Sequence, residues 1–386
     1  MKAIPKKKVI VVDLSVKKTS PAGSCVLSEL LGLAKLFDIH LFTTEFDKHL
    51  EEHVSVHRIT AMRFPLLLRY ILFKRQVNKK IAVFLKKNND VAVIQTTQGQ
   101  YDQSDIAYAH FCHKAYLQQH YGQSTAKGLT RVIRKLGHTF NARQEKKAFQ
   151  NSKVIVVPSK GLGKEISTAY PSEGNKVRVI PNPINLDHFA RPINFDRKAE
   201  RNKHEIGEDE IVVAFVALGD FARKGLPLLL EGLKEENLGK SLFRLLVIGG
   251  NSREIGTYKK MATEQGLGEK VTFKGMQSDV RPFLWSSDLF ALPSSYETFS
   301  LVSAQAAAAG LPILVTPLHG VEDYIDHGYN GWLVNRNSKS IGAVLQQISN
   351  GEYDLKQMGE RAKMSIRPYK EENFRDKWRE LYASLV

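Results

Sequence analysis

Three charged residues in the second half of the sequence directly follow strand patterns, at the place where parallel sheets bind ligands. Arg223 and Lys224 stand side by side in "GDFARKG", and Glu297 lies in "SSYETFSLVSAQ". An arginine can bond two phosphate oxygens at once, a lysine adds a point charge, and a carboxylate accepts hydrogen bonds from hydroxyl groups. The two cations therefore suit a diphosphate, and the acid suits a neighbouring sugar.

Each of these assignments has a plainer alternative. Two cations at the start of a helix are usually solvated, but they are unfavourable against the helix dipole, which favours a function for Arg223 and Lys224. Glu297 could simply complement the N-terminus of the next helix, a contribution of about 0.3 to 1 kcal/mol. Taken alone, that second interpretation is the safer one for Glu297.

The loop after the first strand pattern offers another anion site. In "VKKTSPAGSCVLSEL", Gly23 precedes a helix whose first N–H groups, with Ser24 as a candidate cap, could hold a phosphate. The alternative is an ordinary turn between a strand and a helix. The loop lacks both "GxGxxG" and "GxxxxGK[ST]", which argues against a dinucleotide dehydrogenase and a P-loop nucleotidase.

Strand patterns alternate with helical patterns in both halves of the chain, which predicts parallel sheets covered by helices. The strand patterns are "KVIVVDL", "IHLFTT", "DVAVIQTT", "DIAYAH", "SKVIVVPS" and "KVRVI" in the first half, and "EIVVAFVALG", "FRLLVIGG", "KVTFKG", "LFALPS" and "LPILVTP" in the second. We expect an α/β protein with two doubly wound domains, residues 1–185 and 209–369, and a ligand in the cleft between them. The polar segment 186–208 shows no clear periodicity and is expected to be a linker.

The positive charge of the chain is confined to its first half. The net charge is +16, but residues 1–185 contain 30 Lys and Arg against 13 Asp and Glu, whereas residues 186–386 contain 26 against 27. This asymmetry suggests one face that meets an anionic surface or partner. Stacking aromatics between the cations and a recognisable recognition module are both missing, which argues against nucleic acid.

The basic segment "RYILFKRQVNKKIAVFLKK", within residues 65–87, has two interpretations. It could lie on an anionic membrane, where each cation adds on the order of 1 kcal/mol. Alternatively, it is a core helix with a solvated basic face. Its most apolar run, "FPLLLRYILF", is too short to span a bilayer, so no transmembrane helix is predicted.

The two cysteines, Cys25 and Cys112, are far apart and show no disulfide framework or zinc spacing. A reducing cytoplasm is the expected compartment. The N-terminal "MKAIPKKKVIVVDL" is basic and then apolar, but Asp13 interrupts the apolar run. It is therefore expected to be a buried strand and not a signal peptide.

Several motifs, taken in order, resemble those of the retaining, nucleotide-sugar-dependent family 4 glycosyltransferases of GT-B fold. They are "KVIVVPSKGLGKEI", "GDFARKG", "LVIGG", "PSSYETFSLVSAQAAAAGLPILVT" and "GVEDYIDHGYNGWLV". The form "DFARKG" is similar to that of lipopolysaccharide-core glucosyltransferases. The resemblance implies two Rossmann-like domains that face a central cleft, with the closing helix, residues 370–386, packing back on the first domain.

The resemblance also implies roles for individual residues. Arg223 and Lys224 would neutralise the donor diphosphate, and Glu297 would contact the transferred sugar. His110, in "IAYAHFCH", matches the histidine near the sugar and the acceptor, with His113 as the second candidate. Gly23 would face the diphosphate, in a loop that has one glycine where many members have two. Met276 would lie near the base. The remaining donor contacts would be Thr298, Phe299, Ser300, Leu301 and Val302 at the phosphates and ribose, and Gln305.

Gln305 departs from the family pattern. It lies eight positions after Glu297, where a second acid usually binds the ribose hydroxyls. An amide still accepts one hydrogen bond through its oxygen and donates others, so ribose binding is weakened in principle but not abolished.

The resemblance implies an enzyme that moves a hexose or N-acetylhexosamine, most commonly from UDP, to a lipid-linked or polysaccharide acceptor in cell-envelope synthesis. Because no Asp-x-Asp motif occurs, we expect Arg223 and Lys224 to act without a metal or other cofactor. We expect a cytoplasmic protein that contacts the inner face of the cytoplasmic membrane and binds no nucleic acid. Two alternatives stay open: a soluble small-molecule or protein acceptor, and a non-catalytic nucleotide-sugar binder.

Overall fold

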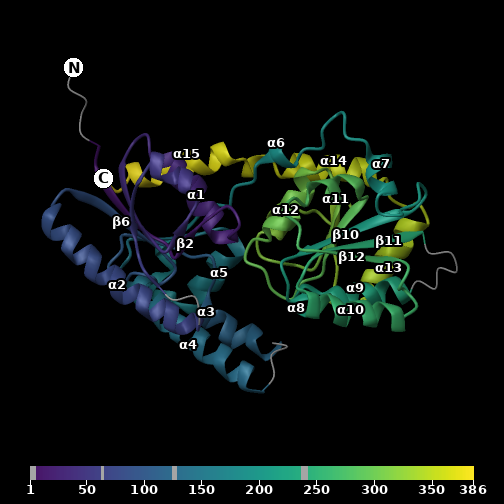
Figure 1. Cartoon of the computed structure of the whole chain (residues 1–386), viewed down its shortest axis with the longest axis horizontal. Helices are drawn as coiled ribbons and strands as arrows, with labels where there is room; N and C mark the ends of the chain where they lie inside the picture. Colours follow the sequence, from purple (N-terminus) through teal and green to yellow (C-terminus); the bar gives the residue numbers. More distant parts are fainter. Residues whose placement is uncertain (1–5, 62–64, 124–127, 236–241) are drawn as a thin grey trace. The chain divides into compact units, whose positions relative to one another are not determined.

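Figure 1 shows a computed structural model of the chain, which describes residues 6–61, 65–123, 128–235 and 242–386. The chain divides into two compact units. The first consists of Met1–Pro183 and Glu371–Val386, and the second of Ile184–Lys370. Each unit contains its own parallel sheet surrounded by helices, which confirms the expected α/β architecture of two doubly wound domains.

The first unit is built on a seven-stranded parallel sheet in the order β5-β3-β1-β6-β7-β8-β9. Its central strands are nearly continuous apolar runs, because helices cover both faces of such a sheet. Val9, Ile10, Val11 and Val12 are fully buried. The strands are β1 (Lys8–Val12), β3 (Asp38–Thr43), β5 (Ser55–Arg58), β6 (Val91–Thr97), β7 (Ile106–Tyr108), β8 (Val154–Val157) and β9 (Val177–Val179), and a separate pair is formed by β2 (Ser15–Val16) and β4 (Glu45–Phe46).

The basic segment of the first unit forms helix α2 (Leu66–Lys87). Phe73, Val77 and Ile81 recur every fourth residue along it, are fully buried and belong to the core cluster that includes Phe42. The apolar face of α2 therefore packs on the sheet, which favours the interpretation as a core helix with a solvated basic face. Among the helices that the structure describes, none is both long and apolar enough to cross a membrane.

The other helices of the first unit include one that the sequence analysis did not anticipate, the long helix α4 (Gly128–Asn151). Helix α15 (Glu371–Ala383), at the end of the chain, packs against α1 (Pro21–Leu33). Trp378 and Tyr382 of α15 are fully buried, so this helix is part of the first core. Two shorter helices, α3 (His113–Ala115) and α5 (Lys160–Ala169), complete this part of the fold.

The second unit is built on a six-stranded parallel sheet in the order β12-β11-β10-β13-β14-β15. Its last strand was not predicted from the sequence. The strands are β10 (Ile211–Ala217), β11 (Phe243–Gly249), β12 (Val271–Gly275), β13 (Leu289–Leu292), β14 (Ile313–Val315) and β15 (Gly331–Leu333). The main helices are α8 (Phe221–Lys224), α9 (Leu226–Glu235), α10 (Ser252–Glu264), α11 (Arg281–Ser286), α12 (Leu301–Ala308), α13 (Ser338–Ser349) and α14 (Leu355–Ser365).

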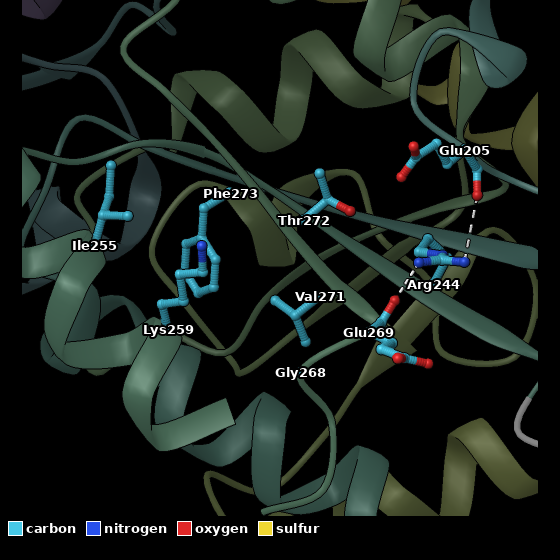
Figure 2. A pocket seen from close by; sticks show the side chains of 9 residues that line it. All are labelled: Glu205, Arg244, Ile255, Lys259, Gly268, Glu269, Val271, Thr272 and Phe273. Atoms are coloured by element: carbon cyan, nitrogen blue, oxygen red, sulfur yellow. Dashed lines mark hydrogen bonds between the residues drawn. The ribbon is translucent and has the colours of Figure 1, made fainter. Parts of the chain in front are cut away.

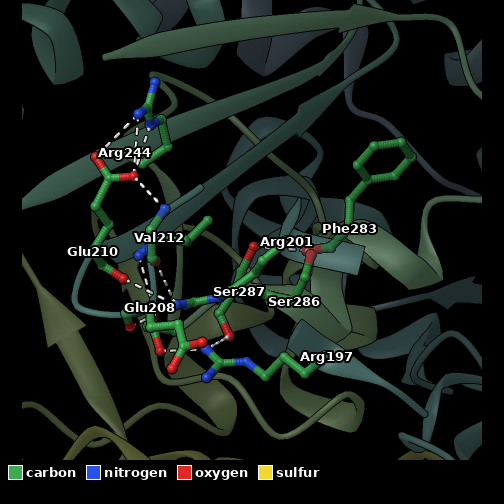
Figure 3. A network of polar contacts seen from close by, with 11 residues as sticks. Arg197, Arg201, Glu208, Glu210, Val212, Arg244, Phe283, Ser286 and Ser287 are labelled. Carbon is green, nitrogen blue, oxygen red and sulfur yellow. Dashed lines mark hydrogen bonds and ion pairs between the residues drawn. The ribbon is translucent and has the colours of Figure 1, made fainter. Parts of the chain in front are cut away.

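The segment 186–208, expected to be a linker, is instead part of the second unit. It forms two short helices, α6 (Leu186–Phe189) and α7 (Arg197–Asn202). Figure 3 shows how Arg201 anchors it: the side chain is buried and donates hydrogen bonds to the carbonyl oxygens of Ser286 (3.0 Å) and Glu210 (3.1 Å) and to the carboxylate of Asp288 (2.5 Å). The polar composition that suggested a free linker is therefore explained by an ion-pair network.

We predict that Arg201→Ala lowers the free energy of unfolding of the second unit by about 1 to 3 kcal/mol, because it leaves the carbonyl groups of Ser286 and Glu210 without their donor. The carboxylate of Asp288 keeps hydrogen bonds from Arg197 and Val212. Urea denaturation measures this change. The control is Lys198→Ala on the same helix, since Lys198 and its partner Glu208 are both about two-thirds exposed and their ion pair should contribute little to stability. Equal losses for the two variants would contradict the anchoring role of Arg201.

Candidate functional site

The order of the second sheet brings two of the predicted loops together. The sheet is wound outward in both directions from the pair β10 and β13, and ligands bind at such a switch point beyond the carboxyl ends of the strands. Helix α8, with Arg223 and Lys224, follows β10, and Glu297 follows β13. The three charged residues predicted from sequence therefore meet at one end of one sheet.

Glu297 connects these loops through one oxygen. Its Oε1 accepts hydrogen bonds from Lys224 Nζ at 2.5 Å, from Ser294 Oγ at 2.9 Å and from Arg223 Nη1 at 3.3 Å. Burial opposes the charge of Arg223, but the carboxylates of Glu297 and Asp220 outweigh it and raise the pKa of Arg223. Glu297 Oε2 and Arg223 Nη2 bind no residue that the structure describes, so an acceptor and a donor are left for a ligand.

Close backbone packing fixes the distance between the loops. Gly225 has φ +86°, and a Cβ atom there would lie 2.1 Å from the carbonyl oxygen of Pro293. The amide of Ser295 then donates to the carbonyl oxygen of Arg223 at 2.9 Å. Only glycine fits this junction, because any side chain would separate the cations from the loop that carries Glu297.

The segment after Glu297 leads into helix α12. This helix begins at Leu301, because Ser300 takes a left-handed conformation (φ +53°) and its Oγ pairs with Ser303 Oγ at 2.7 Å. Phe299 is buried, so it offers a ligand its backbone and not its ring. Val302 is half-buried in the first turn of α12.

Gln305 and Met276 also belong to the second unit. Gln305 lies on α12, is half-buried, and its amide group binds no residue that the structure describes. Met276 is 58% exposed and directly follows Gly275, whose φ of +64° turns the chain at the end of β12. Both side chains are thus available to a ligand, and their predicted contacts with the ribose and the base stay predictions.

Gly23 lies inside helix α1, not ahead of it. The cap is Ser20, whose Oγ accepts from the Gly23 amide at 3.3 Å, whereas Ser24 Oγ donates to the carbonyl oxygen of Pro21. The expected cap at Ser24 was therefore wrong. A Cβ atom at Gly23 would lie 2.1 Å from the carbonyl oxygen of Ser15, so packing alone requires the glycine. A contact between Gly23 and a diphosphate stays a prediction.

His110 follows β7 in the first unit. Its Nε2 is buried and has no hydrogen-bond partner among the residues described, and its ring lies 4.1 Å from that of Tyr108. Burial lowers the pKa of His110 to about 3. The imidazole is thus neutral at physiological pH, and it can orient a hydroxyl group but does not supply a positive charge.

The second candidate, His113, is held by other groups. Its Nδ1 lies 2.9 Å from His138 Nδ1, and its backbone N–H donates to Glu145 Oε2 at 2.9 Å. Burial lowers the pKa of His113 to about 3 as well. Both partners belong to helix α4, so His113 connects the loop after β7 to that helix. Nε2 of His113 has no partner among the described residues, so both histidines keep a ring nitrogen that a ligand could bind.

A separate pocket of about 590 Å³ lies at the opposite end of the second sheet (Figure 2). It is lined by residues at the beginning of β11 and β12, among them Arg244 and Val271. The guanidinium of Arg244 already donates to the carbonyl oxygens of Glu205 and Glu269 and to the carboxylate of Glu210. Arg244, the main cation of this pocket, is thus fully hydrogen-bonded within the protein. The pocket is not where the predicted chemistry lies.

Two groups next to the candidate site were missed from the sequence. Asp220 accepts from Arg223 Nε at 2.9 Å, and Ser294 donates to Glu297. Asp220 stands inside the quoted motif "GDFARKG", three residues before the arginine, and its left-handed backbone (φ +58°) is typical of Asp at a tight turn. Ser294 has no signal in the sequence, since its role depends on the turn that follows β13.

Comparisons with known proteins cover both units. Residues 22–188 match the model of Glycosyltransferase Family 4, and residues 196–365 match that of Glycosyl transferases group 1. The chain is 26% identical to an uncharacterized glycosyltransferase of Methanocaldococcus jannaschii over 305 residues, 76% of this chain and 75% of that protein. It is 29% identical to the lipopolysaccharide core biosynthesis glycosyltransferase LpsE of Rhizobium meliloti over 202 residues, 52% of this chain and about half (55%) of that relative.

The fold is shared with solved structures across the whole chain. The crystal structure of Anabaena HepE in complex with UDP has a TM-score of 0.76 to this chain at 17% identity, and the match covers 98% of this chain and 100% of that one. At an identity this low, the match shows a common fold and nothing about the substrate of this chain.

We predict that His110→Asn makes the stability of the protein less sensitive to acid. The pKa of His110 is about 3 in the folded protein, against about 6.5 in an unfolded chain, so below pH 6.5 the unfolded state takes up a proton that the folded state does not. His110 therefore lowers the free energy of unfolding as the pH falls from about 6.5 to about 3, by up to about 1.4 kcal/mol per pH unit. Parallel pH profiles of unfolding for wild type and variant would contradict this.

Proposed function

We propose that this chain, which belongs to the family 4 glycosyltransferases of GT-B fold, is a retaining enzyme that uses a UDP-sugar. The transferred group is a hexose or an N-acetylhexosamine, and the acceptor is a lipid-linked or polysaccharide glycan of the cell envelope. The observation that carries the proposal is the contact of Glu297 with Lys224 and Arg223 at the switch point of the second sheet. The lipopolysaccharide role of the relative LpsE and the UDP bound to HepE support the choice of substrates.

The proposed chemistry follows from the groups left free at this site. As the bond between the sugar and the diphosphate breaks, negative charge develops on the leaving phosphate, and donors from Arg223 and Lys224 stabilise it where many transferases use a divalent metal. The acceptor oxygen attacks the same face of the anomeric carbon, and its proton passes to the departing phosphate oxygen. Glu297 Oε2 accepts from a sugar hydroxyl, and the neutral imidazole of His110 orients the sugar.

One observation favours a second candidate, a non-catalytic nucleotide-sugar binder. Gln305 replaces an acid of the family pattern, and its amide has no partner among the described residues. The residues proposed to contact the sugar and the diphosphate are nevertheless present and lie together, which supports the proposal of an active enzyme. An enzyme of the same family with a soluble acceptor is the remaining alternative.

The experiment that tests the function is turnover of a panel of nucleotide sugars. We expect release of UDP from UDP-hexoses or UDP-N-acetylhexosamines, without loss of rate in excess EDTA, because the leaving group is stabilised by protein cations. A panel that yields tight donor binding without hydrolysis or transfer supports the non-catalytic alternative. Activity that requires a divalent metal would contradict the proposed role of the cations.

We predict that Arg223→Ala and Lys224→Ala each lower kcat by about 10² to 10³, the usual effect of removing a donor to a developing negative charge. Lys234→Ala is the matched control, since Lys234 is exposed on α9 and outside the site. Steady-state kinetics measure the changes, and unaltered thermal unfolding confirms that each variant is folded. Unchanged turnover in either site variant would overturn its assignment.

We predict that Gln305→Glu tightens donor binding by about fivefold, because a hydrogen bond to a charged acceptor is roughly 1 kcal/mol stronger than one to a neutral acceptor. Titration calorimetry with UDP measures the effect. The gain should disappear with 2′,3′-dideoxy-UDP, which lacks the ribose hydroxyls. If Gln305→Glu binds UDP no more tightly than wild type, the amide is sufficient for ribose binding.

A further inference from the structure

Glu145 is a buried acid for which the mechanism described above has no role. It lies on helix α4, is fully buried, and pairs with no Lys or Arg side chain in the described part of the chain. Acids are almost never fully buried without a cationic partner, because an isolated carboxylate loses its hydration. Its hydrogen bonds therefore indicate what this acid does.

Both oxygens of Glu145 bind the segment that follows His110. Oε2 accepts from the backbone N–H of His113 and Oε1 from that of Lys114, each at 2.9 Å. Oε1 also accepts from the O–H of Tyr170, at the end of α5, at 2.7 Å. The two amides are the first of the short helix α3 and have no partner within it, so the carboxylate supplies their acceptors.

A second side chain holds His110 itself. With its amide oriented to satisfy both neighbours, Gln98 accepts from the backbone N–H groups of His110 at 2.9 Å and Phe111 at 2.7 Å. Gln98 has φ +56°, a conformation that costs energy in a residue other than glycine and that clusters at functional sites. The segment 110–114 is thus held at its beginning by Gln98 and at its end by Glu145.

The two holding groups are packed against each other. Gly99 follows Gln98, and a Cβ atom there would lie 2.6 Å from the amide nitrogen of Glu145. Lys74 Nζ donates to the carbonyl oxygen of Gly99 at 3.0 Å and to Gln144 Oε1 at 2.6 Å, which ties this turn to α4. Glu145 and Gln98 therefore act as one support for the loop after β7.

We propose that Glu145 is a positioning residue: through the amides of His113 and Lys114 it fixes the loop that presents the imidazole of His110 to the donor sugar. Gln98 completes the same support. The inference rests on the proposed function, because the position of the imidazole matters only if His110 orients the transferred sugar. A misplacement of about 1 Å in such a group can cost about 10²-fold in rate.

The ionisation of Glu145 links this support to pH. Burial raises the pKa of Glu145 to about 7, so the carboxylate takes up a proton as the pH falls through that value. A protonated carboxyl group then presents an O–H to one of the two amides that need an acceptor. The loop is therefore held fully only above about pH 7.

The other ionisable groups around Glu145 do not produce such a step. They are Tyr70 on α2, Cys112 and His113 in the loop, and Tyr170 on α5, and the ammonium of the neighbouring Lys114 lies over the ring of Tyr170. Burial raises the pKa of both tyrosines and of the cysteine, and it lowers the pKa of His113 to about 3. None of these four groups changes charge near pH 7.

The first measurement is the release of UDP from UDP-glucose and from UDP-N-acetylglucosamine. We expect Glu145→Gln to lower kcat about a hundredfold and to leave KM for the donor within about twofold, because the cations proposed to bind the diphosphate lie in the second unit. Wild type should lose turnover as the pH falls from about 8 to about 5. Glu145→Gln should show no step near pH 7, since the amide does not titrate.

Two further variants separate positioning from general damage. Gln98→Ala should lower kcat about tenfold and keep the step near pH 7, since Glu145 remains. Glu173→Gln is the control, because it neutralises another buried acid of the first unit, whose partner is Lys176 at 2.6 Å. This control should keep the kcat and the pH profile of wild type.

The second measurement needs no activity. Hydrogen exchange at the amides of His113 and Lys114 reports their contact with Glu145, because neither has another acceptor among the described residues. We expect at least one of them to exchange about tenfold faster in Glu145→Gln, the effect of about one lost hydrogen bond. Thermal unfolding shows that each variant is folded.

Wild-type turnover in Glu145→Gln, or amides that exchange as in wild type, would overturn the role of Glu145. An equal loss of kcat in Glu173→Gln would also overturn it, because the loss would then follow from general destabilisation. A wild type that releases UDP from no nucleotide sugar would instead overturn the proposed function, and with it the role of His110. Faster exchange in Glu145→Gln would in that case still show that Glu145 holds the loop.

Discussion

The contact of two cations with one carboxylate oxygen holds the charged loops of the second unit together. Arg223 and Lys224 are adjacent cations that would repel each other if left alone, and Glu297 Oε1 holds both of them. In the function proposed above, the diphosphate of the donor would bind the same two cations. The two cations are thus held in position before a donor would bind, and preorganised charges of this kind stabilise a leaving group most effectively.

The rest of the second unit keeps that oxygen in position. The glycine at 225 lets the two loops approach, and the ion-pair network of Arg201 fixes the segment that enters the sheet through β10. These features lie at opposite ends of the sheet. One determines the geometry of the site, and the other determines the stability of the strands that support it.

The sequence predicted what depends on local pattern. Long apolar strands, the charged loops after β10 and β13, and the two-domain class are all visible as runs and motifs, and they were found. What it missed includes a partner that is distant in the chain: Arg201 looked like part of a polar linker because its partner Asp288 lies far away in the sequence. The cap of α1 was missed although Ser20 stands directly before Pro21, a local signal for the start of a helix.

The position of α15 has a consequence for how the protein is made. Trp378 and Tyr382 belong to the core of the first unit, yet the whole second unit is translated before them. During synthesis, the surface of α1 that packs against α15 stays exposed until α15 has been translated. The second unit can already fold during this time. The first unit therefore completes its folding only after the whole second unit has been translated.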